Sequence, residues 1–223
     1  MSTDAVIVAA GSSTRFGETD KLTASLAGRP VLAWSLAAYA AAPAIDRLVV
    51  VTGGDNHAWV RDLASEWAPT MDVCVVEGGA RRRDSVAAGL AASRARYVAI
   101  HDGARPLTTT DLIERVIAAA EGTNGAIAAM PVTDTIKEVR ATTIFGHPER
   151  AGLWAAQTPQ VVLRQAWLDA ARMSDNDETD DAAMLSRLGL ECQVVESSAE
   201  NIKITRPLDL QIAELILRSW GLA

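Results

Sequence analysis

The chain has 223 residues and a formal net charge of −7, with 49% hydrophobic and 22% charged residues. This composition is typical of a globular protein with a sizeable core, and the acidic balance argues against binding to nucleic acid or anionic membranes. No apolar run approaches the roughly 18 residues of a membrane span. We find no signal-peptide pattern, and Cys74 and Cys192 lie in strand-like runs, so we expect reduced thiols in a cytoplasmic protein.

Strand-like and helix-like runs alternate along the chain. The strand-like runs are rich in small and β-branched residues and cover 5–10, 47–52, 71–77, 96–102 and 125–132. The helix-like runs between them cover 31–42, 56–67, 84–94 and 110–121. Near-continuous apolar strands separated by helices are typical of a parallel sheet covered on both faces. The pattern therefore predicts an α/β fold, with a Rossmann-like, mostly parallel sheet and helices on both faces.

The alternation stops at residues 132–150, which are polar and include "VTDTIKEV" and "TTIFGH". This stretch predicts a protruding β-arm, near 132–153. Further helices are expected near 164–173 and 180–188, a strand near 191–196, and a last helix from Pro207, since proline favours the first turn. With no linker or internal repeat, the sequence predicts one domain over 1–223.

Glycines and cationic residues follow the strands of the predicted sheet. The segments are "AAGSSTRFG", "EGGARRRDSV", "HDGARP" and "PVTDTIK". Ligands bind beyond the carboxyl ends of parallel strands, so these segments indicate a site for a multiply charged anion. Neither the dinucleotide fingerprint nor the P-loop pattern is present. The first segment could be an ordinary tight turn, but bare backbone N–H groups beside Arg15 and Lys21 suit phosphates.

The segment "AAGSSTRFGETDKL" resembles the signature loop of nucleotidyltransferases, and "GGARRRDSVAAGL" resembles a stretch of the cytidylyltransferases among them. "HDGARP", "DTIK", "QTPQ", "TDDAAML" and "NIKITRPLDL" follow in the order of that family. Together they cover nearly the whole chain and most resemble the 2-C-methyl-D-erythritol 4-phosphate cytidylyltransferases. The related ribitol-5-phosphate cytidylyltransferases usually have "AGG" and "HDSVRP" where this chain has "AAG" and "HDGARP".

Two positions depart from the family pattern. Ser13 replaces the second glycine of the loop, and Asp20-Lys21 stands, one residue early, where Pro-Lys is expected. Two alternatives stay open. One is a cytidylyltransferase for ribitol phosphate or another polyol phosphate, as in the related family. The other, of which Ser13 and the shifted Lys21 would be the marks, is a nucleotide-binding module without catalysis.

The resemblance implies transfer of CMP from CTP to methylerythritol phosphate with release of pyrophosphate, in a homodimer that uses Mg²⁺. A phosphate dianion is already a deprotonated nucleophile, so such a site needs positioning and cations rather than a covalent nucleophile. The resemblance assigns three catalytic cations, Arg15, Lys21 and Lys203. It assigns CTP binding to Ala9, Ala10, Gly11, Ser12, Gly78, Gly79, Arg82, Ser85, Asp102 and Gly103. It assigns the acceptor polyol phosphate to Asp102, Arg105, Thr135, Arg150 and Thr158, and Asp102 is also the candidate metal ligand.

Five further residues receive structural interpretations. His101 is expected to be a packed or hydrogen-bonding residue rather than a catalyst. Arg81 and Arg83 have no counterpart in the motif and are interpreted as solvated surface. Asp180 and Asp181 precede "AAMLSRL" and are interpreted as N-caps of a helix.

Overall fold

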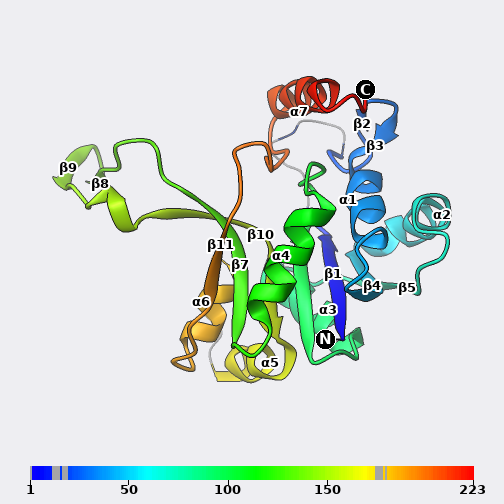
Figure 1. Ribbon diagram of the computed structural model, residues 1–223, viewed down its shortest axis with the longest axis horizontal. Helices are drawn as coiled ribbons and strands as arrows, with labels where there is room; N and C mark the ends of the chain where they lie inside the picture. Colours follow the sequence, from blue (N-terminus) through cyan, green and yellow to red (C-terminus); the bar gives the residue numbers. More distant parts are fainter. Residues whose placement is uncertain (1, 12–15, 17–19, 174–177, 179) are drawn as a thin grey trace.

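A seven-stranded sheet forms the centre of the molecule in the computed structural model (Figure 1). The structure describes residues 2–11, 16, 20–173, 178 and 180–223. The strands of the sheet are β1 (Thr3–Ala9), β4 (Ile45–Thr52), β5 (Val73–Glu77), β6 (Tyr97–Asp102), β7 (Gly125–Pro131), β10 (Trp154–Leu163) and β11 (Gln193–Glu196). Their order across the sheet is β11-β7-β10-β6-β1-β4-β5.

The sheet is mostly parallel, as predicted. β1 pairs in parallel with β4 and β6, β4 with β5, and β7 with β11. β10 lies between β6 and β7 and runs antiparallel to both. The sequence did not predict β10, because Gln157, Pro159 and Gln160 interrupt its apolar run. This strand carries polar side chains into the middle of the sheet.

Helices cover both faces of the sheet, and each face has its own core cluster. One cluster takes buried side chains from α1 (Val31–Ala40), α2 (His57–Trp67), α4 (Thr110–Ala120) and α7 (Pro207–Ser219). The other takes them from α3 (Arg82–Ala92), α5 (Arg164–Met173) and α6 (Asp181–Ser186). None of the helices in the described part of the chain is both long and apolar enough to cross a membrane.

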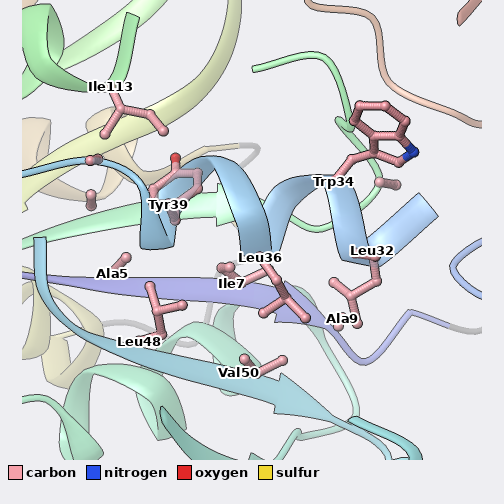
Figure 2. Close-up of a cluster of buried hydrophobic side chains, with 14 of the residues drawn as sticks. Ala5, Ile7, Ala9, Leu32, Trp34, Leu36, Tyr39, Leu48, Val50 and Ile113 are labelled. Atoms are coloured by element: carbon pink, nitrogen blue, oxygen red, sulfur yellow. The ribbon is translucent and has the colours of Figure 1, made fainter. Parts of the chain in front are cut away.

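β1 shows how a strand buried on both faces serves the two cores. Ala5, Ile7 and Ala9 point into the cluster beneath α1 (Figure 2), while Val6 belongs to the opposite cluster. This alternation follows from the two-residue period of a strand and accounts for the unbroken apolar run in the sequence. The end of β1 is thereby fixed from both sides.

The helix boundaries agree with local capping signals. Thr109 caps α4 by accepting a hydrogen bond from Leu112 N at 3.2 Å. α7 begins at Pro207, as predicted. Both cysteines are free, as expected.

An arm projects from the sheet between β7 and β10 (Figure 1). It contains an antiparallel hairpin of β8 (Glu138–Arg140) and β9 (Thr143–Gly146), followed by the 3₁₀ turn η2 (Arg150–Gly152). The predicted excursion from the βα alternation is therefore confirmed. Val139, Ile144 and Phe145 on the hairpin are each more than half exposed. The three remaining short elements are β2 (Ser25–Leu26), β3 (Arg29–Pro30) and η1 (Gly54–Asn56).

Candidate active site

Two pockets lie side by side beyond the end of β6 and share one wall. The first has a volume of about 330 Å³, and its lining includes Ala9, Ala10, Gly11, Lys21, Gly79 and Ser85. The second has a volume of about 280 Å³, and its lining includes Arg105, Gln157, Thr158, Gln160 and Asp180. Arg82, Asp102 and Lys203 line both pockets. This arrangement can hold two ligands that meet at a wall of two cations and one carboxylate.

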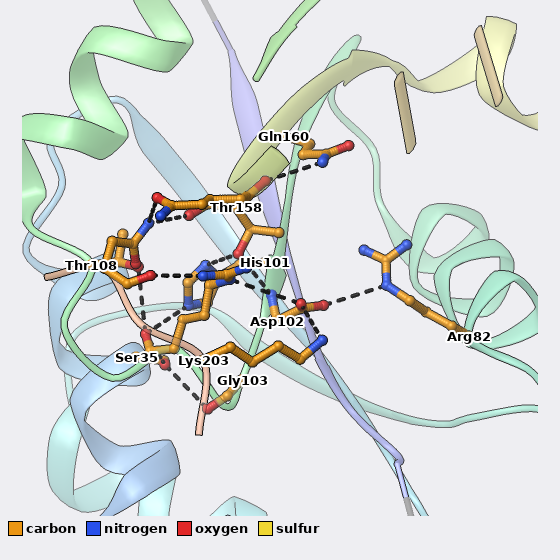
Figure 3. A network of polar contacts seen from close by, with 12 residues as sticks. Ser35, Arg82, His101, Asp102, Gly103, Thr108, Thr158, Gln160 and Lys203 are labelled. Atoms are coloured by element: carbon orange, nitrogen blue, oxygen red, sulfur yellow. Dashed lines mark hydrogen bonds and ion pairs between the residues drawn. The ribbon is translucent and has the colours of Figure 1, made fainter. Parts of the chain in front are cut away.

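Asp102, the last residue of β6, is the centre of the shared wall (Figure 3). Lys203 Nζ lies 2.7 Å from its Oδ2, Arg82 Nε lies 3.3 Å from its Oδ1, and Arg105 Nε lies 4.0 Å from Oδ2. Burial alone would raise the pKa of Asp102, but the charges of Lys203, Arg82 and Arg105 hold it well below its ordinary value. Asp102 is therefore a carboxylate that fixes three cations.

A buried hydrogen-bond chain holds Asp102 from behind. Its backbone N–H donates to Thr158 Oγ1 at 3.2 Å, and the Thr158 hydroxyl lies 2.9 Å from His101 Nδ1. His101 Nε2 lies 3.2 Å from the carbonyl oxygen of Arg105, which can only accept. The consistent pattern has the ring proton on Nε2 and the Thr158 hydroxyl donating to Nδ1. Burial lowers the pKa of His101 to about 3, so the neutral ring is part of the folded state.

His101 predicts a specific pH dependence of stability. Its pKa falls from 6.5 to about 3 on folding, so the unfolded chain binds a proton that the folded chain does not. The contribution of His101 to the free energy of unfolding is complete above its pKa in the unfolded chain, 6.5. This contribution is lost as the pH falls toward the pKa in the folded chain, about 3. Between pH 6.5 and 5, the free energy of unfolding is expected to fall more steeply than in His101→Gln, by up to about 1.4 kcal/mol per pH unit. Urea unfolding of the wild type and of His101→Gln across this pH range measures the difference. Equal slopes of the free energy of unfolding against pH would contradict the prediction.

Asn201 fixes the segment that brings Lys203 to the site. Its Oδ1 accepts from Thr108 Oγ1 at 2.8 Å, and its Nδ2 donates to Gln157 Oε1 at 3.0 Å and to the Thr158 carbonyl at 2.9 Å. Its own carbonyl accepts from Arg105 Nη1 at 2.7 Å. The side chain is only 2% exposed. One amide thus ties β10, the β6–α4 connection and the Lys203 segment together.

Two glycines of the β5–α3 turn allow close packing, Gly78 against the residue that follows β1 and Gly79 against the first turn of α3. A Cβ added to Gly78 would lie 2.4 Å from Ala10 Cβ, and one on Gly79 would lie 2.4 Å from Asp84 Cβ. Gly79 N also donates to Ser85 Oγ at 3.1 Å. The β5–α3 turn therefore requires bare backbone, which leaves polar main-chain groups and a hydroxyl at the wall of the first pocket.

The structure brings most of the sequence-predicted residues to these two pockets. Lys21, despite its shifted place in the motif, lines the first pocket. Among the described residues, four of the predicted ones line neither pocket, and they are two glycines and two residues of the arm. Gly78 and Gly103 lie in tight packing, where an added Cβ would meet Ala10 or Leu32.

Thr135 and Arg150 are exposed on the arm, outside both pockets of their own chain. Arg150 Nη1 donates to the carbonyl of Thr133. Ser12, Ser13 and Arg15 lie outside the described residues.

Two interpretations from the sequence are wrong. Arg83 is not solvated: it is 8% exposed, and its Nη2 donates to the Ala171 carbonyl at 2.7 Å. Its helix face turns toward α5, which the motif spacing does not reveal. Asp180 is an N-cap, accepting from Ala183 N at 2.8 Å, but the Asp181 carboxylate instead pairs with Arg82 at 2.7 Å.

The sequence motifs did not single out three polar residues of the site. Gln157, Gln160 and Asn201 are each less than 10% exposed and hydrogen-bond one another or the site segments. The motifs "QTPQ" and "NIKITRPLDL" contain them, but only Lys203 and Thr158 were singled out. For Gln157 and Gln160, the available signal was an uncharged amide at the end of an apolar run.

Known protein sequences match this chain over nearly its whole length. The profile of IspD, described as 2-C-methyl-D-erythritol 4-phosphate cytidylyltransferase, matches residues 3–219. The chain is 44% identical over 220 residues to the 2-C-methyl-D-erythritol 4-phosphate cytidylyltransferase of Prochlorococcus marinus, covering 95% of this chain and 96% of that protein. It is 41% identical over 221 residues to the protein of that name from Cereibacter sphaeroides strain ATCC 17023, covering 97% of each.

Solved structures match over the same length. The 4-diphosphocytidyl-2C-methyl-D-erythritol synthase of Anaerococcus prevotii superposes with a TM-score of 0.86 at 26% identity, covering 97% of this chain and 98% of that one. The 2-C-methyl-D-erythritol 4-phosphate cytidylyltransferase of Thermus thermophilus superposes with a TM-score of 0.78 at 28% identity, covering 98% and 100%. The family model, the curated relatives and the solved structures all match over nearly the whole chain, and the chain belongs to the 2-C-methyl-D-erythritol 4-phosphate cytidylyltransferase family.

Proposed function

We propose that the protein transfers CMP from CTP to 2-C-methyl-D-erythritol 4-phosphate, giving 4-diphosphocytidyl-2-C-methyl-D-erythritol and pyrophosphate. The observation that carries the proposal is the pair of pockets joined at Arg82, Asp102 and Lys203 in a chain of this family. The first pocket would hold CTP, and the second would hold the acceptor. The two reacting phosphates then meet at the shared wall.

The chemistry needs no covalent intermediate on the protein. An oxygen of the acceptor phosphate attacks the α-phosphorus of CTP, a new P–O bond forms, and the bond to the bridging oxygen breaks as pyrophosphate leaves. Both reactants are anions, so the barrier contains charge repulsion and charge developing on the phosphoryl oxygens. Cations held in place before the reaction lower such a barrier because they need no reorganisation. Lys21 and Lys203 have that role in the proposal, together with Arg15.

Mg²⁺ is the proposed cofactor. Within the described part of the chain, no group of three or more acidic, histidine or cysteine side chains could hold a metal alone. This donor set fits Mg²⁺ bound mostly by phosphates and water, because Mg²⁺ often takes only one or two protein carboxylates. Asp102 is the carboxylate available in the shared wall. When bound, the ion would neutralise phosphate charge.

The proposed assembly is a homodimer in which the arm reaches the partner subunit. Thr135 and Arg150 line neither pocket of their own chain, and the hairpin exposes three large apolar side chains. By the family resemblance, these two residues would serve the acceptor site of the partner. An arginine suits this task because its planar fork can bind two phosphate oxygens.

A pyrophosphate-release assay tests the proposed reaction. Release is expected from CTP only when both methylerythritol 4-phosphate and Mg²⁺ are present. Ribitol 5-phosphate in a parallel reaction is the control for acceptor identity. Faster turnover of ribitol phosphate would replace the proposal by the polyol-phosphate alternative. CTP binding without turnover of either acceptor would support the non-catalytic module.

A further inference from the structure

We propose that Asp181 is a positioning residue that holds Arg82 in the wall between the two pockets. This inference rests on the proposed function, because it concerns how that wall is kept in place for the reaction. Asp181 lines neither pocket and lies behind Arg82, on α6.

The Asp181 carboxylate is buried and each of its oxygens has a fixed donor. The residue is 1% exposed; Oδ2 lies 2.7 Å from Arg82 Nη2, and Oδ1 accepts from Trp167 Nε1 at 3.1 Å. Trp167 is itself 1% exposed within the core between α5 and the sheet. The carboxylate therefore has little freedom to turn away from the guanidinium.

The backbone of Asp181 is fixed as well. Gln160 Oε1 accepts from Asp181 N at 2.9 Å and from Ala182 N at 3.1 Å. Gln160 belongs to β10 and lines the second pocket, so the wall of that pocket and the first turn of α6 form one unit. Asp180 already caps the helix, so helix capping does not require the Asp181 carboxylate.

Arg82 is shared between two carboxylates. Its Nη2 contacts Asp181 and its Nε lies 3.3 Å from Asp102 Oδ1 (Figure 3 shows the contact with Asp102). Fixing a guanidinium at two points restricts its orientation, since its donors form a rigid planar fork. Without the Asp181 charge, Arg82 would turn toward Asp102 alone and compete there with Lys203. A carboxylate buried as deeply as that of Asp181 is costly unless it is paired. Its charged partner is Arg82, so the role of Asp181 lies in holding that guanidinium.

A double-mutant cycle on kcat tests the inference. Asp181→Asn keeps the size of the side chain and removes its charge, and it is expected to lower kcat by about tenfold or more. Arg82→Ala is expected to lower kcat further. If Asp181 acts through Arg82, the double variant equals Arg82→Ala, because the residue to be positioned is gone. Effects that multiply, or an Asp181→Asn enzyme with normal kcat, would overturn the inference.

Met184→Ala is the matched control for lost stability. Met184 lies on the same helix, is 1% exposed in the same core, and lines neither pocket. Met184→Ala should lower the midpoint of urea unfolding, as truncation of a buried side chain does. The kcat of Met184→Ala per folded molecule should equal that of the wild type, whereas the kcat of Asp181→Asn should be lower.

Two further arms keep the test decisive. If Asp181→Asn does not fold, Trp167→Phe enters the cycle instead, because it removes one donor to Asp181 and leaves the carboxylate. Wild-type turnover tests the proposed function separately. If the wild type does not turn over, the same four proteins are titrated with CTP, since Arg82 lines the first pocket. Non-additive affinities then support the positioning role, and additive ones overturn it.

Discussion

Replacing Lys203 by alanine is expected to lower kcat by ~10²–10³ and to change the affinity for CTP much less. Lys203 Nζ lies 2.7 Å from Asp102 in the wall common to both pockets, where the proposed reaction has its developing charge. A cation at that position acts mainly in the transition state. A loss in kcat with a nearly constant affinity is the kinetic signature of such a group. Pre-steady-state turnover and CTP titration of the same preparation measure the two quantities.

Arg115→Ala is the control for the loss of one positive charge. Arg115 is an exposed residue of α4 whose guanidinium pairs with Asp111 four residues earlier, away from both pockets. The kcat of Arg115→Ala should match that of the wild type. Circular dichroism should show both variants folded, because Arg82 and Arg105 still face Asp102 after Lys203 is removed. Near-normal turnover of Lys203→Ala would identify the lysine as a structural partner of Asp102 only.

Mixing two inactive variants is expected to restore activity if the arm serves the partner subunit. Lys21→Ala damages the first pocket and Arg150→Ala damages the arm, so each alone should lose nearly all turnover. After refolding together in equal amounts, random pairing gives about half mixed dimers, each with one intact site. Activity should then approach roughly a quarter of the wild type. Turnover before and after mixing is the measurement.

Lys21→Ala mixed with Lys203→Ala is the matched control. Both residues line the first pocket of one chain, so every site of a mixed dimer carries one lesion. This mixture should stay inactive under the same conditions. The shared-site hypothesis is wrong if the Lys21→Ala and Arg150→Ala mixture also stays inactive after mixed dimers are shown to form.

The sequence predicts the parallel part of the sheet well, because strands buried on both faces are continuous apolar runs. β1 and β4 are of this kind, and they were placed to within two residues. β10 was missed for the opposite reason. It carries Gln157 and Gln160, which a sequence pattern assigns to surface or loop, yet both are buried against partners more than twenty residues away.

The roles of charged residues could likewise be predicted from the sequence only for residues that line a ligand pocket. Glycines and cations after strands pointed to the segments that carry Lys21 and Arg82, because parallel strands end at one edge of the sheet, whereas Lys203 was assigned from the family resemblance. Asp181 was misassigned because its position before a helix fits a cap, and its pairing with Arg82 spans 99 residues. Contacts at such separations depend on how α6 packs, which local spacing does not encode.

The hydrogen bonds of Asn201 have a consequence for how the protein loses activity on heating. Residues 197–206 contain no helix or strand, and this segment carries Lys203 as well as the carbonyl that holds Arg105. Its opening would withdraw one cation and release another without separating any pair of strands. Segments with few regular hydrogen bonds open at lower free energy than the sheet they cover. Thermal inactivation would then begin as a reversible local event, at a temperature where the sheet is still intact.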